Sequence, residues 1–456
     1  MPVDVSRLLS EARKHLDSGE YDLATSKLEE ILSVVPESAE GHVEALVHLG
    51  EILWQNGKYD EARETLKRAQ ELGNNEGYIN LSARAQRLTG NTLIDQGFGQ
   101  LAERSYRTAL EMFESIDDTK GIARCYNNLG IISVDKGNFI DALKYYEQSL
   151  DMHRELGDEV GTGMCLNNIG EIHRFKGEYE LAEELYQESL VGDTERGDRY
   201  GQAICWGNLG AVSYGRKEYA KAEERVRRAV EIFNKLGTRD LVYVEIRGLL
   251  VGIMAATKRF DEGQTHLDAI WDAAESLNSD AADIICHFYG GLLAQRQWNL
   301  SFARKHYNNC LELSKRARSF EFVLLSLMQL VEIEMLHYRV TGEEQYLEAM
   351  QRTLHQALSL AETHNLHAPL VELMVLNALF HVESQNPERG LELLKEAKEV
   401  CHKKGFESRE RTIVSLMEDI HVRLESDATK TETVEAKLKR LQEYIEDCQR
   451  VVLASK

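Results

Sequence analysis

Apolar and small residues between positions 121 and 158 fall at the spacing of two consecutive helices. The first run covers residues 125–133 at intervals of three and four, and a Gly-Asn pair at 137–138 interrupts it. In the second run, apolar positions again share one helical face until a Gly-Asp pair at 157–158. These positions are Phe139, Ala142, Leu143, Tyr146, Ser149 and Leu150. The pattern predicts a helix, a short turn and an antiparallel helix.

The same pattern recurs every forty residues along the first half of the chain. One position of the repeat is always glycine and a second is always alanine. They are Gly50, Gly90, Gly130, Gly170 and Gly210, and Ala62, Ala102, Ala142, Ala182 and Ala222. A fixed period of this length indicates a solenoid, in which small units stack and each contacts only its neighbours. We therefore predict about six regular units over residues 5–237.

The pattern becomes less regular after residue 240 but continues to predict helices. Two divergent units are expected at 241–318, two divergent helix pairs at 320–405 and a single helix at 407–425. Residues 433–454 then place apolar side chains at alternating spacings of four and three, which is typical of a short coiled-coil seam. Two interpretations stay open for this segment. It is either a C-terminal helix that caps the last repeat, or a helix through which two copies form a homodimer.

The repeat unit resembles the tetratricopeptide repeat (TPR) in the identity and order of its marker residues. The residues that carry the resemblance are Tyr126, Leu129, Gly130, Ala142 and Tyr146. The step of forty residues, with the sequences YNNLG, LNNIG and WGNLG, is similar to the Pins-type branch of these proteins. The resemblance implies an all-α, right-handed α-α superhelix, a TPR solenoid whose first helices line the concave side. With the segment at 433–454, we expect a C-terminal capping helix on this solenoid.

The charge of the chain limits the classes of partner. The formal net charge is −22 for 456 residues, from 76 acidic and 54 basic side chains. An acidic surface repels phosphate backbones and anionic lipids, so no nucleic acid and no membrane is expected as a partner. It attracts basic partners, although the same charge also keeps a long helical protein in solution. Because no apolar run of eighteen residues and no signal-peptide pattern occurs in the sequence, we expect a cytoplasmic protein.

The sequence contains no pattern that is typical of catalysis. It lacks a phosphate loop of the form GxxxxGKS or GxxxxGKT, a nucleophile elbow and an HExxH pair. Seven cysteines are an odd number for a disulfide framework and show no CxxC spacing. His364 and His367 lie one helical turn apart, but the sequence fixes no third ligand beside them. We therefore expect no enzyme activity, no cofactor and no metal site.

The TPR resemblance implies that polar residues on the first helices face the groove. An amide side chain carries a donor and an acceptor, so it can pair with the backbone of an extended peptide, and arginine can bind carboxylates or phosphates bidentately. The predicted partner-binding residues are Arg84, Arg87, Asn91, Arg124, Asn127, Asn128, Asn167, Asn168, Arg174 and Asn208. In this set Asn128, Asn168 and Asn208 recur one unit apart and form a predicted ladder. A competing interpretation is that the asparagines only bridge neighbouring units.

Two further features of the first helices bear on the kind of partner. Part of the carboxylate clamp by which some TPR proteins hold chaperone tails is resembled by Arg87, Asn91, Asn128 and Arg124. Met164 and Asn168 occupy the remaining basic positions of that clamp. Binding of a chaperone tail is therefore not expected. The first helices after residue 200 also become rich in small residues. These are Gly207, Ala211, Gly215, Gly248, Gly252, Ala255 and Ala256, which either open a pocket for a bulky partner side chain or let the helices pack more closely.

These observations predict a non-catalytic protein–protein interaction scaffold or adaptor. It would hold an extended peptide or a helix of another protein in its concave groove. An alternative is a ligand- or peptide-responsive regulatory sensor. A third interpretation is the binding half of a peptide-regulated phosphatase. Such proteins carry a helical bundle in front of their repeats, and we expect no room for one because the first unit begins near Val5.

Overall fold

A computed structural model describes residues 4–426 except 18–19, 137, 177, 278, 318, 364–366, 385 and 405. Within these residues every regular element is a helix and none is a strand. The predicted C-terminal helix at 433–454, any homodimer contact through it, and His364 lie outside the described residues.

The described helices form two compact units. The N-terminal unit comprises Met1–Val134 and Ile140–Gly161, and the C-terminal unit comprises Asp135–Phe139 and Thr162–Lys456. The helices of the N-terminal unit are α1 (Val5–Asp17), α2 (Tyr21–Val34), α3 (Glu40–Gln55), α4 (Tyr59–Glu76), α5 (Ile79–Asp95), α6 (Gly99–Glu114), α7 (Thr119–Asp135) and α8 (Phe139–Glu155). The division falls inside the regular repeats rather than at their end near residue 237.

The C-terminal unit continues with longer helices toward its end. Its helices are α9 (Glu159–Lys176), α10 (Tyr179–Arg196), α11 (Arg199–Gly215), α12 (Tyr219–Leu236), α13 (Leu241–Ala256), α14 (Phe260–Leu277), α15 (Asp280–Arg296), α16 (Leu300–Ala317), α17 (Phe320–Thr341), α18 (Glu344–Thr363), α19 (His367–Glu383), α20 (Pro387–Lys404) and α21 (Glu407–Ser426).

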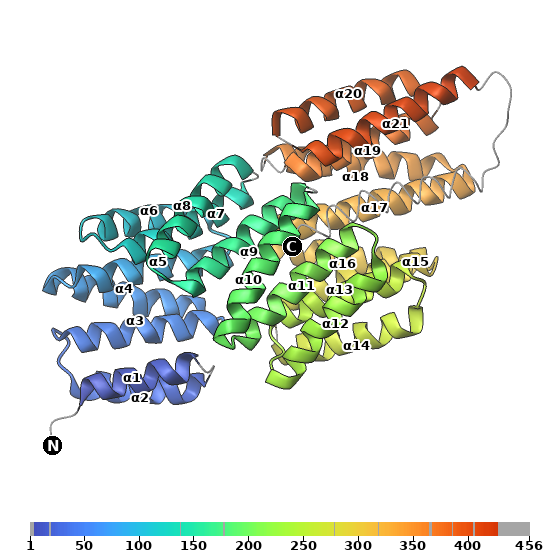
Figure 1. Ribbon diagram of the computed structural model, residues 1–456. Helices are drawn as coiled ribbons and strands as arrows, with labels where there is room; N and C mark the ends of the chain where they lie inside the picture. Colours follow the sequence, from blue (N-terminus) through green and yellow to red (C-terminus); the bar gives the residue numbers. More distant parts are fainter. Residues whose placement is uncertain are drawn as a thin grey trace. The chain divides into compact units, whose positions relative to one another are not determined.

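Odd-numbered helices up to α19 are the first members of helix pairs, and they touch one another within each unit. Contacts join α1 to α3 and α3 to α5 in the N-terminal unit, and they join α11, α13, α15, α17 and α19 in succession in the C-terminal unit. The second helices pack instead against the first helices before and after them in the sequence, and Figure 1 shows these neighbours side by side. The first helices therefore form one layer of each unit, which we call the first-helix layer.

The core is shared between successive pairs, which explains why the units stack. One cluster combines Leu93 of α5, Ala102 and Tyr106 of α6, and Leu129 and Ile132 of α7. All five side chains are buried. A single pair could not remove this apolar surface from water, so each pair depends on the first helix of the next.

Gly90 shows why the repeat requires glycine at its first marker position. The ring of Tyr106 packs on this stretch of α5, and a Cβ atom at Gly90 would collide with that ring. Gly130 has the same relation to Tyr146. The glycine on the first helix and the tyrosine on the second helix are therefore two halves of one contact.

The turn between the two helices of a pair holds one residue in the left-handed region. Glycine occupies it early in the chain, with φ of 71° at Gly57 and 77° at Gly97. Later pairs place Lys217, Lys258 and Trp298 there, with φ of 65°, 60° and 61°. Because a Cβ atom is disfavoured in this conformation, the later turns carry backbone strain that the glycine turns do not.

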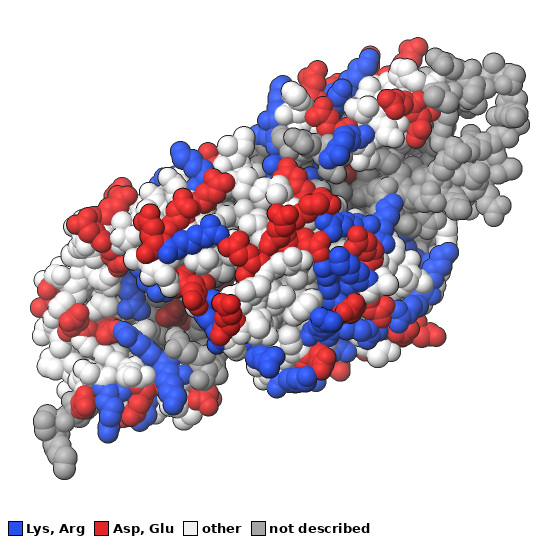
Figure 2. Space-filling view, in the orientation of Figure 1, with Lys and Arg blue, Asp and Glu red and all other residues white. Residues whose placement is uncertain are grey.

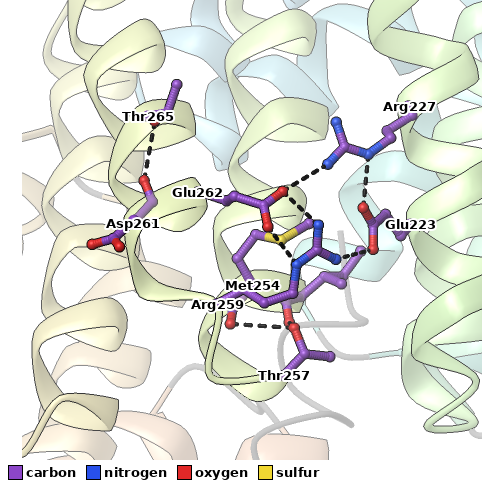
Figure 3. A network of polar contacts seen from close by, with 9 residues as sticks. Glu223, Arg227, Met254, Thr257, Arg259, Asp261, Glu262 and Thr265 are labelled. Atoms are coloured by element: carbon purple, nitrogen blue, oxygen red, sulfur yellow. Dashed lines mark hydrogen bonds and ion pairs between the residues drawn. The ribbon is translucent and has the colours of Figure 1, made fainter.

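Charged side chains connect the second helices of successive helix pairs. Figure 3 shows Arg259, in the turn before α14, between Glu223 of α12 and Glu262 of α14. Arg227 of α12 also reaches both carboxylates, with Nε 2.8 Å from Glu223 Oε1 and an Nη atom 3.5 Å from Glu262 Oε2. Charges of both signs are interspersed over the face of the molecule in Figure 2. The net charge of −22 is therefore not gathered in one acidic patch on this face.

Candidate partner-binding surfaces

The ten predicted binding residues all lie on first helices but divide between the two units. Arg84, Arg87 and Asn91 lie on α5, and Arg124, Asn127 and Asn128 lie on α7, all in the N-terminal unit. Asn167, Asn168 and Arg174 lie on α9 and Asn208 lies on α11, all in the C-terminal unit. The predicted ladder of three asparagines is thus shared between the units, so we treat the two groups as separate surfaces.

The amides of the N-terminal unit bond to each other across neighbouring first helices. Asn128 Nδ2 donates to Asn91 Oδ1 at 3.0 Å, and the Tyr106 hydroxyl donates to the same oxygen at 3.0 Å. Asn127 and Asn128 are both buried. These contacts are the ones expected if the asparagines bridge neighbouring units, which is the competing interpretation. The NH2 group of Asn91 has no partner among the residues that the structure describes, so it remains a donor.

A similar bridge connects α9 and α11 in the C-terminal unit. Asn208 Nδ2 donates to Asn167 Oδ1 at 3.5 Å, and Asn167 Nδ2 donates to Ser189 Oγ at 3.1 Å. Asn208 and Asn167 are only half-buried. Within the described part of the chain, nothing bonds to Asn208 Oδ1, which leaves an acceptor at the surface of the first-helix layer.

Arg174 takes part in an internal ion pair rather than in a surface. Its side chain is fully buried and contacts the Glu171 carboxylate, with Nε 2.9 Å from Glu171 Oε2. The Tyr186 hydroxyl donates to that same oxygen at 3.0 Å. Burial lowers the pKa of Arg174, but the Glu171 carboxylate and Tyr186 raise it overall. The guanidinium thus orients neighbouring helices, and a partner could reach it only if the side chain moved.

The arginines of the N-terminal unit are different because two of them form no ion pair with a described residue, although the Glu51 carboxylate raises the pKa of Arg87 from a longer distance. Arg84 lies 3.8 Å from Glu44 Oε1, and Glu44 is also paired with Arg13. Arg87 and Arg124 form no hydrogen bond or ion pair with any residue in the described ranges. Burial and the nearby Arg124 charge both lower the pKa of the half-buried Arg87 guanidinium. Two positive charges therefore face each other in a chain that is strongly acidic as a whole.

A pocket opens in the first-helix layer of the C-terminal unit, and the predicted set contains only one of its residues. Its volume is about 220 Å³. It is lined by Ile204, Gly207, Asn208 and Ala211 of α11, by Val242, Glu245, Ile246 and Leu249 of α13, by Ile285, Phe288 and Tyr289 of α15, and by Phe322 and Leu325 of α17. Some of the small residues after position 200 line this pocket, and some allow close helix packing. Gly207 and Ala211 line the pocket. A Cβ atom would collide with Ile246 at Gly207 and with Tyr289 at Gly248, so both glycines allow close packing.

The remaining chemistry of the described residues is limited. No group of three or more His, Cys, Asp or Glu side chains in the described ranges could hold a metal ion. No helix in the described part of the chain is long and apolar enough to cross a membrane.

Comparison with known proteins identifies the repeats. A tetratricopeptide repeat model matches residues 15–85, and a second matches residues 81–155, 134–190 and 161–235. These matches identify tetratricopeptide repeats within residues 15–235. These matches do not distinguish the Pins-type branch from other TPR proteins. No curated protein matches the sequence.

Solved structures extend the likeness beyond the matched repeats. A Rap protein complexed with Competence and Sporulation Factor is similar over 79% of this chain and 98% of that chain, with 16% identity and a TM-score of 0.58. A second similar structure is a signal transduction ATPase with numerous domains and a tetratricopeptide repeat sensor, from Pyrococcus horikoshii. The similarity extends over 66% of this chain and 46% of that chain, with 20% identity and a TM-score of 0.49. The Rap likeness confirms the predicted all-α TPR solenoid as the fold.

Proposed function

We propose that this protein is a non-catalytic scaffold whose first-helix layer binds an extended segment of another protein. In the N-terminal unit that segment is acidic. The observation that carries this proposal is the pair Arg87 and Arg124, whose charges repel each other and which form no hydrogen bond or ion pair with a described carboxylate. The Glu51 carboxylate acts on Arg87 only from a longer distance, and the pKa of Arg87 stays lowered. A bound carboxylate would relieve their repulsion and would accept charge-assisted hydrogen bonds.

The neighbouring amides support binding of a peptide backbone next to these charges. Arg87 and Asn91 are four residues apart on α5 and therefore share a face of that helix. Asn128 fixes the orientation of the Asn91 amide, because its Nδ2 donates to Asn91 Oδ1. The Asn91 NH2 group is then available to donate to a peptide carbonyl. In the C-terminal unit, Asn208 Oδ1 offers the matching acceptor for a peptide N–H.

A glutamate octapeptide with a fluorescent label provides a direct probe of this proposal. A chain of net charge −22 repels such a peptide unless a local positive site binds it. We expect the Arg87→Gln/Arg124→Gln variant to bind it about ten- to a hundredfold more weakly in fluorescence anisotropy, because charge-assisted bonds are lost.

The matched control removes the same charge from the second helices of the same unit. Arg68 pairs with Glu37, and Arg107 Nη2 lies 2.8 Å from Glu103 Oε1. The Arg68→Gln/Arg107→Gln variant should change the affinity by less than about threefold. Equal weakening in both variants would show that the peptide responds only to net charge and would overturn the proposed surface.

The finer predictions from the sequence belong to the same proposal. We infer a Pins-type origin of the repeats, a cytoplasmic location and no catalytic activity. The fold likeness to a Rap protein that was complexed with Competence and Sporulation Factor supports peptide binding at the level of the fold alone. Absence of turnover on a panel of phosphoproteins would agree with a scaffold, whereas turnover would favour the phosphatase interpretation.

A regulatory sensor is a second proposal, and the division into two compact units favours it. A ligand that binds one state of such a protein better shifts the population toward that state. Small-angle scattering with and without the glutamate octapeptide tests this role. A change in the radius of gyration would support the sensor, and an unchanged value at saturation would leave the scaffold role.

A further inference from the structure

The pocket of the C-terminal unit has the dimensions of a receptor for one large side chain. A cavity of about 150 Å³ is sufficient for benzene, and pockets for whole drug-sized molecules begin near about 300 Å³. At about 220 Å³ the pocket holds a single ring-sized group with its linker. Four successive first helices form its walls, so its shape depends on the packing of the whole layer.

The walls of the pocket are apolar and include aromatic rings in edge-on contact. The Phe288 ring lies 5.6 Å from the ring of Tyr289 and 5.7 Å from the ring of Phe322, with interplanar angles of 78° and 66°. All three rings are buried, whereas Ile204 and Val242 are only half-buried. The apolar lining therefore continues to the protein surface, where a side chain from outside can enter. An added ring would gain edge-to-face contacts as well as burial.

The polar groups of the pocket indicate which chemical groups should flank the ring in the partner segment. Glu245 is the one charged residue among the described lining residues, and it is an acid that also interacts with another residue of the protein. Asn208 lies in the same lining and has an acceptor oxygen that no described residue occupies. A carboxylate beside an apolar pocket attracts a positive group and repels a negative one. The amide oxygen suits a backbone N–H of an extended chain.

We propose that this pocket anchors a partner segment through one aromatic side chain that is flanked by lysine or arginine. The side chain fills the space beside Ala211, the flanking cation lies near Glu245, and the backbone N–H donates to Asn208 Oδ1. This inference deepens the proposed scaffold function but concerns a different unit from the arginine pair. The two proposals can therefore fail separately.

Three acetylated and amidated tripeptides separate the ring from the charge: Lys-Phe-Lys, Lys-Ala-Lys and Glu-Phe-Glu. Small ligands of this kind bind in the millimolar range, so NMR titration of the full-length chain is the suitable assay. We expect Lys-Phe-Lys to bind about tenfold or more tightly than Lys-Ala-Lys, because burying a phenyl ring contributes that factor. We also expect it to bind more tightly than Glu-Phe-Glu.

Two variants, with Ala220→Phe as a control, locate the site. Ala211→Phe fills the pocket and should remove the preference for Lys-Phe-Lys over Lys-Ala-Lys, whereas Ala220→Phe on the exposed face of α12 should retain it. Glu245→Gln leaves the pocket open and should reduce the preference for Lys-Phe-Lys over Glu-Phe-Glu, so the test does not depend on Ala211→Phe folding.

Three results would contradict the proposed anchor or the role of Glu245. Equal affinity of the wild-type chain for Lys-Phe-Lys and Lys-Ala-Lys, or an unchanged ring preference in a folded Ala211→Phe variant, would overturn the anchor. An unchanged charge preference in Glu245→Gln would overturn the role of that carboxylate. The Arg87→Gln/Arg124→Gln variant should bind all three tripeptides like the wild type. Failure of the wild-type chain to bind the glutamate octapeptide, with the tripeptide preferences intact, would then count against the N-terminal surface only.

Discussion

Replacement of Arg87 by methionine should make the N-terminal unit more stable, although it removes a long, partly buried side chain. Methionine retains the apolar part of the side chain and removes the charge. In the folded protein this charge forms no ion pair with a described residue, and burial and Arg124 lower the pKa of the guanidinium more than the Glu51 carboxylate raises it. The charged form is therefore less stable in this position than in water.

The size of the effect follows from the extent of burial. An ion that is fully buried without a partner costs several kcal/mol, but Arg87 is only half-buried and water still reaches part of it. We therefore expect Arg87→Met to stabilise the N-terminal unit by about 1–2 kcal/mol. Hydrogen exchange followed by mass spectrometry isolates α5 from the rest of the chain. Exchange in α5 should slow by about five- to thirtyfold where it requires unfolding of the unit.

Arg107→Met provides the matched control, because that arginine is exposed and paired with Glu103. It should leave exchange in α5 unchanged or make it slightly faster. Sulfate should slow exchange in the wild-type α5 more than in Arg87→Met, since only the wild type keeps both facing cations. Faster exchange in Arg87→Met, or an equal sulfate effect in the two proteins, would refute the interpretation of Arg87 as a strained charge.

Three further predictions concern packing, backbone strain and pH. Gly130→Ala should destabilise the N-terminal unit by about 1–3 kcal/mol in urea unfolding, because the tyrosine ring packed on it must move; an unchanged midpoint would contradict that contact. Lys258→Gly should stabilise its turn and Gly57→Ala should destabilise its own, each by about 1 kcal/mol, since both positions have positive φ; effects of the same sign would contradict this. Burial raises the pKa of Glu183, but Arg225 and two other cations lower it to about 2 overall, so its contribution to stability is present above pH 4.5 and is lost as the pH falls toward 2. Glu183→Gln should therefore reduce the loss of stability over this pH range, and an unchanged pH profile would count against the pairing.

The helix pairs could be predicted because each repeat contains the residues that form its own packing contacts. The glycine at position 90 and the tyrosine at 106 form one contact, and the spacing of these residues is visible in the sequence. The division between the units was not visible. It falls near residues 134–161, where the repeat keeps all its marker residues. Contacts between successive pairs decide such a division, and a repeat motif does not encode their strength.

The candidate surfaces depended on geometry that spacing does not determine. The sequence placed Asn91, Asn128, Asn167 and Asn208 on first helices, and the structure confirms that placement. It could not show that these amides pair with each other, because that depends on the rotation of neighbouring helices. The pocket was harder still to predict, because its lining residues come from four helices and lie as far apart in the sequence as Ile204 and Leu325. The roles of the ten predicted residues in binding stay predictions.

The central claim is that the first-helix layer, rather than the second helices, receives the partner. Hydrogen exchange of the wild-type chain at saturating glutamate octapeptide tests this most directly. We predict slower exchange in α5 and α7, with α4 and α6 unchanged. Protection confined to α4 and α6, or no protection at all while the peptide is bound, would contradict it.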